Sequence, residues 1–312
     1  MQERAIEQVK KIYDIDNSST LELLGGFDNN VYLCRDKNIV IKFLDKVTHK
    51  KEYLLNELEV INLMMTHGIH TPAPIPSKNG MVIELIKGMK KDFYLVAFSY
   101  VKGKILLDYE EDNQLIKQWG KTLGKMHNIS KNFAFKLDNF FVDWNYDINF
   151  EKFSKGKGQL IEKKWRTYMK KLSSMSCNQD MYGIVHHDLH NQNIIISDNK
   201  MYVLDFGDVR KSWYAYDASI PVFHALEKNR KNKTDNIKFY ERFTKYFFEG
   251  YCETSNFSID QFKLIPFFLE YRLLYSYLFF INSFPSNKMS SDMKNSLDRM
   301  RYRIENNVPF IT

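Results

Sequence analysis

The chain has 312 residues, enough to bury a sizeable hydrophobic core in one large domain or two smaller ones. Its composition, rich in Phe and Tyr and poor in Gly and Pro, excludes long disordered stretches. The formal net charge is +7, but the basic residues are spread along the chain, so the charge predicts solvated helix faces and no nucleic-acid partner.

Cysteine usage and hydropathy predict a cytoplasmic protein without membrane contact. The chain has three widely spaced cysteines and no CxxC pair, a pattern typical of a reducing compartment: Cys34, Cys177 and Cys252. The N-terminal stretch MQERAIEQVKKIYDI lacks the apolar core of a signal peptide. The most apolar stretch, residues 264–284, carries Glu270 and Arg272 near its middle, where charges are costly in lipid. We therefore expect a buried helix there.

The first hundred residues mix short strands with helices. Residues 5–13 have the pattern of an amphipathic helix, and residues 19–44 predict three strands, among them VYLC and IVIKF, joined by tight turns. A second helix follows, with Gly68 as its stop signal and apolar residues at helical spacing: Leu54, Leu58, Ile61 and Met65. Three prolines within TPAPIPSKNG (71–80) predict a loop and exclude both a helix and a central strand.

The remainder of the chain changes character. After a hairpin-like pair, MVIELI and FYLVAFSYV, most segments are helical, and only residues 194–197 and 201–204 interrupt with strand character. We expect two lobes: residues 1–98 form a nucleotide-binding lobe, 99–103 a hinge, and 104–312 a helical lobe with the acceptor site.

One polar stretch, HHDLHNQNIIISDNKMYVLDFGD, carries the chemistry. Asp188 and Asn193 lie on a loop that leads into strand 194–197, and the returning strand delivers Asp205 beside that loop. Carboxylates resist burial unless a cation meets them, and Asn193 and Asp205 are the hard oxygen ligands that Mg²⁺ prefers beside phosphate. Asp188 is placed to accept a hydroxyl proton or to orient the hydroxyl for in-line attack.

The pattern resembles the kinase superfamily, whose catalytic loop reads H-x-D-x4-N and whose metal loop reads D-F-G. More closely, HHDLHNQN resembles the aminoglycoside phosphotransferase and choline kinase family, where H-G-D-L-H-x-x-N is common. His187 replaces the usual Gly, so we expect the loop to avoid backbone conformations that only Gly favours, and Asn191 replaces a frequent Pro. The resemblance implies an α+β, protein-kinase-like bilobal fold, with an antiparallel sheet and one main helix in the first lobe.

The same resemblance implies the nucleotide-binding residues, with ATP or GTP as the phosphate donor. Lys42, on the predicted third strand, would contact the phosphates and pair with Glu57 on the following helix, with Glu59 as the alternative. Asp188 would be the catalytic residue, and Asn193 and Asp205 the Mg²⁺ ligands.

Further nucleotide contacts are implied around the hinge and the first hairpin. Gly25 and Gly26 would let the backbone approach phosphates, although a plain hairpin is an equal alternative. The backbone of Ser99 and Val101 would bind the base, and His190 would contact phosphate or pack. The turn residues Asp28 and Asn29 lie in the same hairpin; His186 would support the loop backbone.

The segment after D-F-G is short and has no A-P-E, which favours a small hydroxylated acceptor over a peptide. A helix is expected to start near Asp217, an N-cap candidate that the family uses to brace the catalytic loop. Acidic and aromatic side chains could hold a cationic acceptor, with packing in the core of the helical lobe as the alternative: Asp138, Asp143, Trp144, Asp147, Trp213, Tyr214, Glu270 and Tyr271.

We therefore predict a Mg²⁺-dependent transfer of the nucleotide γ-phosphate to a small-molecule hydroxyl, such as that of an aminoglycoside-like antibiotic or an amino alcohol, by a monomer or homodimer. The alternatives are an atypical protein kinase and a non-catalytic nucleotide-binding protein.

Overall fold

The structure is a computed structural model that describes residues 3–26, 30–88, 91–137, 141–145, 150–231 and 235–311. Its internal contacts divide the chain into two compact units, one formed by residues 1–105 and 193–207 and the other by 106–192 and 208–312. The division falls just beyond the expected hinge at 99–103. It also groups the two strands of the D-F-G hairpin with the first unit, whereas we had expected them in the helical lobe.

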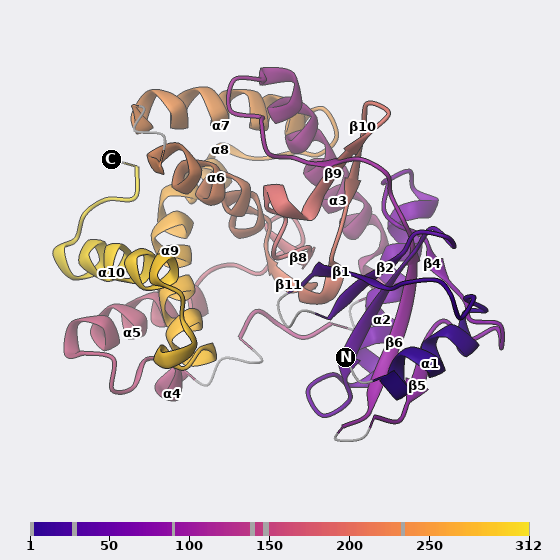
Figure 1. Ribbon diagram of the computed structural model, residues 1–312. Helices are drawn as coiled ribbons and strands as arrows, with labels where there is room; N and C mark the ends of the chain where they lie inside the picture. The colour runs from indigo at the N-terminus through magenta and orange to yellow at the C-terminus, as the bar shows by residue number, and fades with distance from the viewer. Residues whose placement is uncertain are drawn as a thin grey trace. The chain divides into compact units, whose positions relative to one another are not determined.

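The first unit contains α1 (Glu3–Ile12), β1 (Glu22–Gly25), β2 (Val31–Cys34), β3 (Ile39–Asp45), α2 (Lys51–Thr66), β4 (Pro74–Ile75), β5 (Glu84–Ile86), β6 (Phe93–Ser99), β7 (Lys104–Ile105), β9 (Ile194–Ser197) and β10 (Lys200–Val203). Its main sheet is antiparallel, with the order β1-β2-β3-β6-β4 and with β5 paired to β6 (Figure 1). A second antiparallel sheet has the order β10-β9-β7. The predicted antiparallel first lobe is confirmed.

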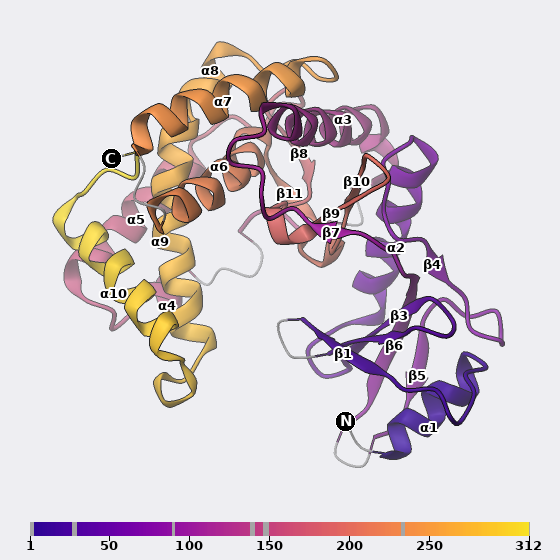
Figure 2. The same cartoon turned by 45° about the horizontal axis from the view of Figure 1, so that its top comes forward.

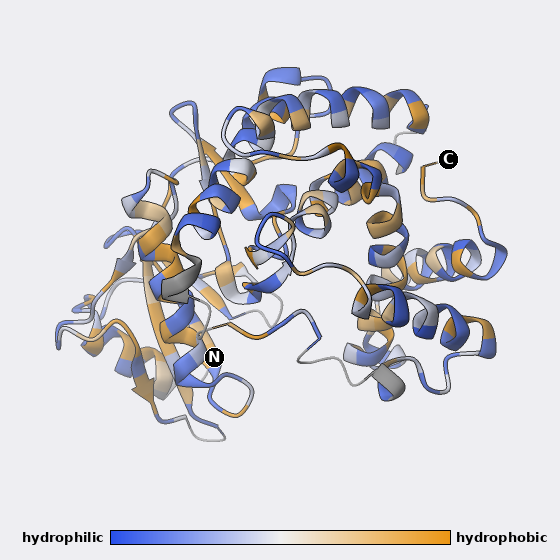
Figure 3. Cartoon of the chain, turned by 180° about the vertical axis from the view of Figure 1, so that it is seen from behind, coloured by the Kyte–Doolittle hydropathy of each residue, from blue (hydrophilic) through white to orange (hydrophobic). Residues whose placement is uncertain are grey.

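The core of this unit follows from the alternation of side chains along its strands. Ile39, Ile41 and Phe43 of β3 are buried together with Leu95 and Ala97 of β6. The amphipathic helix α1 packs its apolar side on the same cluster and lies beside β5 in both cartoon views (Figure 1 and Figure 2). Figure 3 shows the hydrophobic colouring along the strands of this sheet, whereas the helices carry both colours.

Helix α2 buries the face that its spacing predicts, with one change. Leu54, Leu58 and Ile61 are buried, but the next buried residue is Met64, and the expected Met65 is half-buried. A step of three residues after Ile61 keeps the stripe on one face of a 3.6-residue helix as well as a step of four. Gly68, with φ +77°, follows the helix end as predicted.

The proline-rich segment 71–80 is not entirely a loop. Pro74 and Ile75 form the short strand β4, which pairs with Phe98 and Ala97. The strand lies at the edge of the sheet, where the missing N–H of proline costs no ladder bond on the outer side. The exclusion of a helix and of a central strand is confirmed, whereas the prediction of a loop over the whole segment was wrong.

The second unit is mainly helical, as predicted. It contains α3 (Asn113–Leu137), α4 (Phe150–Ser154), α5 (Gln159–Ser173), β8 (Tyr182–Val185), β11 (Arg210–Trp213), α6 (Tyr214–Lys231), α7 (Asn236–Cys252), α8 (Ile259–Lys263), α9 (Ile265–Ser283) and α10 (Ser291–Asn306). β8 and β11 form a two-stranded antiparallel ladder. The apolar stretch 264–284 forms the buried helix α9, as expected. Within the part of the chain that the structure describes, every helix is too short or too polar to cross a bilayer.

Candidate functional site

Lys42 projects from the middle of β3 and contacts the acid of the D-F-G motif. Its neighbours Ile41 and Phe43 face the core, so alternation turns Lys42 to the opposite side of the sheet. The Lys42 Nζ lies 2.9 Å from Asp205 Oδ1, and the two side chains are 21% and 53% exposed. A lysine and the motif aspartate are therefore brought together within the first unit.

The strand–turn–strand of the motif has the predicted form. β9 and β10 pair in register, and Asp198 and Asn199 adopt positive φ values of +47° and +57° in the turn between them. Beyond the last pair, the Leu204 N–H donates to the Asn193 carbonyl at 2.9 Å. This bond places the backbone of Asn193 beside that of Leu204, one residue before Asp205. The convergence of the Asn193 and Asp205 side chains on one ion stays a prediction.

The residues present fit a divalent ion and a phosphate chain. Gly207 leaves space beside the ion pair, because a Cβ there would lie 3.4 Å from Asp205 Oδ1 and 3.8 Å from Lys42 Nζ. Among the described residues there is no cluster of three or more His, Cys, Asp or Glu side chains that would cage a metal. An ion held by one carboxylate and one amide would take its other ligands from phosphate and water, as Mg²⁺ commonly does.

The β1–β2 hairpin depends on its two glycines. Gly25 and Gly26 have φ values of +127° and +89°, in the region that L residues rarely adopt. A Cβ at Gly26 would lie 2.4 Å from Asn30 Oδ1 and 2.9 Å from Val31 Cγ2. The expected turn residues Asp28 and Asn29 lie outside the described residues.

The hinge residues and Glu57 are placed but their roles remain predictions. The Ser99 N–H donates to the Ala73 carbonyl at 2.8 Å, and the Ser99 hydroxyl accepts from the Ala73 N–H at 2.9 Å. Val101 lies two residues beyond the end of β6 and is half-buried. On α2, Glu57 is half-buried whereas Glu59 is exposed, which favours Glu57 of the two as a partner for a strand lysine.

The catalytic loop in the second unit has a strained backbone at its second histidine. His187 adopts φ +70°, so the expectation that the loop avoids glycine-like conformations is wrong. Asp217 holds this conformation, because its carboxylate accepts from the backbone N–H groups of His186 at 3.2 Å and His187 at 2.7 Å. His127 Nε2 lies 2.9 Å from the same carboxylate. The packing around the loop thus offsets the cost of a non-glycine residue.

Asp217 therefore braces the loop instead of capping a helix. Helix α6 begins at Tyr214, so Asp217 lies inside its first turn and the N-cap prediction is wrong. The side chain is completely buried, and the N–H donors and the imidazole compensate that burial. His186 supports the loop as predicted, because its Nδ1 accepts from the Asp188 N–H at 3.3 Å.

The carboxylate of Asp188 contacts the side chains of Arg272 and His190. Arg272 Nη2 donates to Asp188 Oδ1 at 2.8 Å, and His190 Nε2 lies 3.3 Å from Asp188 Oδ2. Burial acts to raise the pKa of the Asp188 carboxyl, but the His190 hydrogen bond and the Arg272 charge outweigh it and hold the pKa well below its usual range. His190, expected to contact phosphate or to pack, contacts the carboxylate of Asp188.

Sequence reasoning missed Arg272. It comes from the buried helix α9 and is 9% exposed. Its signal was present, since a cation in the middle of an apolar helix needs a partner inside the protein. That position was used only to exclude a membrane span.

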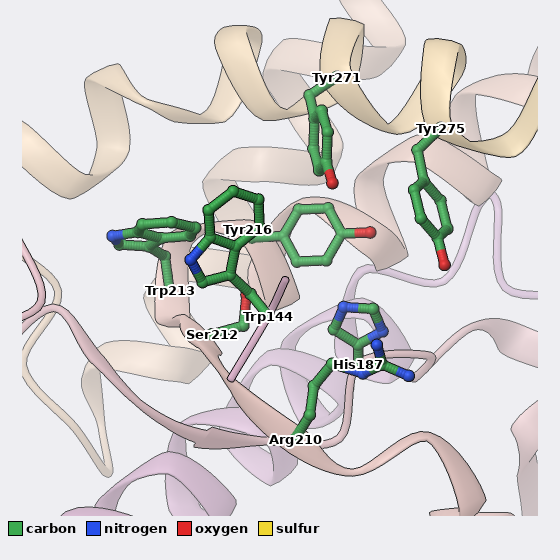
Figure 4. A pocket seen from close by; sticks show the side chains of 8 residues that line it. All are labelled: Trp144, His187, Arg210, Ser212, Trp213, Tyr216, Tyr271 and Tyr275. Carbon is green, nitrogen blue, oxygen red and sulfur yellow. The ribbon is translucent and has the colours of Figure 1, made fainter. Parts of the chain in front are cut away.

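A pocket beside the catalytic loop is lined by aromatic rings and by polar groups (Figure 4). Tyr271 and Tyr275 project from α9 on one side of the pocket, and Arg210 and His187 lie on the opposite side. Among the described residues that line it, none is acidic: Trp144, His187, Arg210, Ser212, Trp213, Tyr216, Tyr271 and Tyr275.

Some of the expected acceptor residues line this pocket, and others contact different parts of the fold. Trp144, Trp213 and Tyr271 line the pocket. Asp143 accepts from the Tyr182 hydroxyl at 2.8 Å, and Glu270 accepts from the Phe310 N–H at 2.5 Å, so both carboxylates bind other parts of the fold. Tyr214 is buried against the His127 ring. Asp138 and Asp147 lie outside the described residues.

Comparison with known proteins gives a consistent match. Residues 19–254 match the model of the phosphotransferase enzyme family. Amicoumacin kinase from Bacillus subtilis (strain 168) is 26% identical over 297 residues, which cover 93% of this chain and 88% of that protein. A solved amicoumacin kinase in complex with AMP-PNP, Ca²⁺ and Ami superposes with a TM-score of 0.88 at 22% identity, covering 99% of this chain and 94% of the other. A microcompartment-associated aminopropanol kinase superposes with a TM-score of 0.76 at 18% identity, covering 100% of both chains.

Proposed function

The chain belongs to the phosphotransferase enzyme family and transfers phosphate from a nucleotide to a small molecule, and on this premise we propose that its acceptor is an amicoumacin-like compound and its metal is Mg²⁺. The observation that carries the acceptor proposal is the likeness to amicoumacin kinase in sequence and in fold over nearly the whole chain, both units included. We also propose a cytoplasmic location, which the free thiols Cys34, Cys177 and Cys252 support.

The first unit supplies the nucleotide side of the reaction. We propose that Lys42 contacts the phosphates with Glu57 as its partner, and that Asn193 and Asp205 hold the ion. When bound, Mg²⁺ neutralises charge on the phosphate oxygens. Gly25 and Gly26 would let the hairpin backbone approach the phosphates, and the backbone of Ser99 and Val101 would bind the base.

The second unit supplies the acceptor side. Asp188 would face the acceptor hydroxyl, either orienting it or taking its proton. We propose that the acceptor lies beside the pocket whose aromatic lining includes Trp144, Trp213 and Tyr271. Arg210 in the lining disfavours a purely cationic acceptor and suits a carbonyl or carboxylate.

An amino alcohol is the second candidate acceptor, because the superposition with the aminopropanol kinase covers the full length of this chain and of that kinase. A protein acceptor is disfavoured, since β11 and α6 follow Asp205 within nine residues and leave little chain for a peptide groove.

The test is ADP release from MgATP and MgGTP with separate acceptors: amicoumacin, aminopropanol, choline and spectinomycin. We expect turnover with amicoumacin to exceed that with the amino alcohols by at least about 10²-fold, since buried polar and ring contacts discriminate at this level. Asp188→Asn should lose about 10³-fold in kcat, within the range of general acid–base and positioning effects, while calorimetry shows unchanged nucleotide binding. Faster turnover with aminopropanol would reassign the acceptor. Phosphate incorporation into polypeptide alone would point to the protein-kinase alternative.

A further inference from the structure

We propose that Arg272 is a positioning residue for phosphoryl transfer, which fixes the Asp188 carboxylate as an orienting group for the acceptor hydroxyl. The proposal rests on the proposed function in taking Asp188 as the residue that faces the acceptor. It adds a residue from α9, far away in sequence, to the catalytic loop and chooses between the two roles that remain open for Asp188.

The guanidinium is fixed at two points. Its Nη2 donates to Asp188 Oδ1 at 2.8 Å, and its Nη1 donates to the Tyr216 hydroxyl at 3.2 Å. Tyr216 is itself 2% exposed and packs against Phe268 and Tyr271, so its oxygen is a rigid anchor. Because the guanidinium is planar, its bond to the Tyr216 hydroxyl restricts its orientation, and its Nη2–H then restricts the position of Asp188 Oδ1.

The second carboxylate oxygen has its own donor. The Gln192 N–H donates to His190 Nδ1 at 3.1 Å, so in the neutral ring the proton is on Nε2. That Nε2–H points to Asp188 Oδ2 at 3.3 Å. Each carboxylate oxygen thus receives a donor from the protein.

A carboxylate held in this way is a poor base. The pKa of Asp188 lies well below its usual range, because the His190 hydrogen bond and the Arg272 charge outweigh burial. The other titratable groups that face it are His187 on its own loop and His224 and Tyr216 on α6. A carboxylate with so low a pKa accepts the hydroxyl proton only weakly in the transition state. A loose phosphoryl transition state requires little removal of that proton. Orientation of the hydroxyl is the role that remains.

The experiment measures kcat against pH, nucleotide affinity by calorimetry, and Tm for the wild type, Arg272→Gln, Arg272→Lys and Tyr216→Phe. In Arg272→Gln we expect kcat to fall about 10²-fold, as for a misplaced catalytic group, with unchanged nucleotide affinity. The loss of the Arg272 charge raises the pKa of Asp188, so the acidic limb of the kcat profile moves to higher pH. Arg272→Lys keeps the charge and should restore the position of the limb but only part of kcat.

Arg242→Gln is the matched control. Arg242, on α7, donates to Glu111 at 3.1 and 3.2 Å, so this variant also removes a guanidinium from a carboxylate, away from the catalytic loop. It should leave kcat and its pH profile unchanged.

Several results would overturn the proposal. One is a folded Arg272→Gln protein with wild-type kcat and pH profile, and another is a lower Tm with unchanged kcat per folded molecule. If Arg272→Gln does not fold, Tyr216→Phe decides, since it removes only the anchoring oxygen: a wild-type kcat and profile would count against us. If the wild type phosphorylates no acceptor, the proposed function fails separately, and a carbon-detected NMR titration of Asp188 in the wild type and Arg272→Lys then tests the contact itself.

Discussion

A single backbone angle separates His187 from its neighbours in the catalytic loop. Its φ of +70° is one that L residues adopt at a cost of about 1–2 kcal/mol, and glycine adopts it freely. The sequence motif identified the replacement of glycine at this position, but the short-range pattern could not show that the backbone would keep the glycine conformation. The bonds from the His186 and His187 N–H groups to Asp217, thirty-one and thirty residues away, hold it there.

This strain predicts an order of stability between two variants. His187→Gly and His187→Ala lose the same imidazole contact with Tyr216, but only the alanine retains the strained backbone. We expect His187→Gly to be the more stable of the two by about 1 kcal/mol, measured as the free energy of unfolding in urea. If the alanine variant proves equally or more stable, Asp217 does not hold the loop in a strained conformation.

For the other site residues too, the sequence predicted short-range contacts and missed long-range ones. The spacing of Asn193 and Asp205 predicted that a short hairpin joins them, and the pairing of β9 with β10 confirms that hairpin. Arg272 is 84 residues from Asp188, so only the folded helix α9 reveals their contact.

At the scale of elements, helices and strands followed their apolar periodicity, whereas the close crossing of α3 and α7 left no periodic signal. The crossing depends on glycine, because a Cβ at Gly120 would lie 1.8 Å from the Phe247 carbonyl oxygen and one at Gly250 1.9 Å from that of Lys117. A glycine inside a helix is ordinarily a weak point, and its meaning here comes from the partner backbone.

Gly120→Ala tests this crossing by the sign of its effect. Helix propensity alone predicts stabilisation by about 1 kcal/mol, whereas a methyl group against a carbonyl oxygen predicts destabilisation by about 1–3 kcal/mol. We expect net destabilisation, read as a lower midpoint in urea unfolding. Asn128→Ala, at an exposed position of the same helix, is the control and should be neutral or slightly stabilising. A more stable Gly120→Ala protein would mean that the two helices are not in close contact.

For the whole molecule, the division into an antiparallel sheet unit and a helical unit could be read from the order of strand and helix patterns along the chain. The membership of residues 193–207 in the first unit could not, because it depends on contacts such as the Val203 N–H to the His70 carbonyl at 2.9 Å and the Ser197 hydroxyl to the Lys102 carbonyl at 2.8 Å. Long-range hydrogen bonds of this kind have no local sequence pattern.

Several buried ionisable groups make the whole chain less stable as the pH falls below neutral. Burial lowers the pKa of His127, His187 and His224 below the ordinary 6.5, so the unfolded chain binds more protons than the folded chain as pH falls below that value. Their contribution is fully present above pH 6.5 and is lost as pH falls, and the lowered pKa of Asp188 acts in the same sense at more acidic pH.

We therefore expect the free energy of unfolding to fall between pH 7.5 and pH 5, with a slope of up to about 1.4 kcal/mol per pH unit for each histidine. His224→Phe removes one of the three histidines and should therefore reduce the slope of the unfolding free energy against pH by the contribution of that histidine. It should cost little at neutral pH, since the His224 Nε2 has no hydrogen-bond partner among the described residues and the ring packs against Phe223. The measurement is urea unfolding at half-unit pH steps for both proteins. A slope that is the same in both would show that His224 titrates alike in the folded and unfolded chains, and a stability that rises on acidification would reverse the sign assigned to all three histidines.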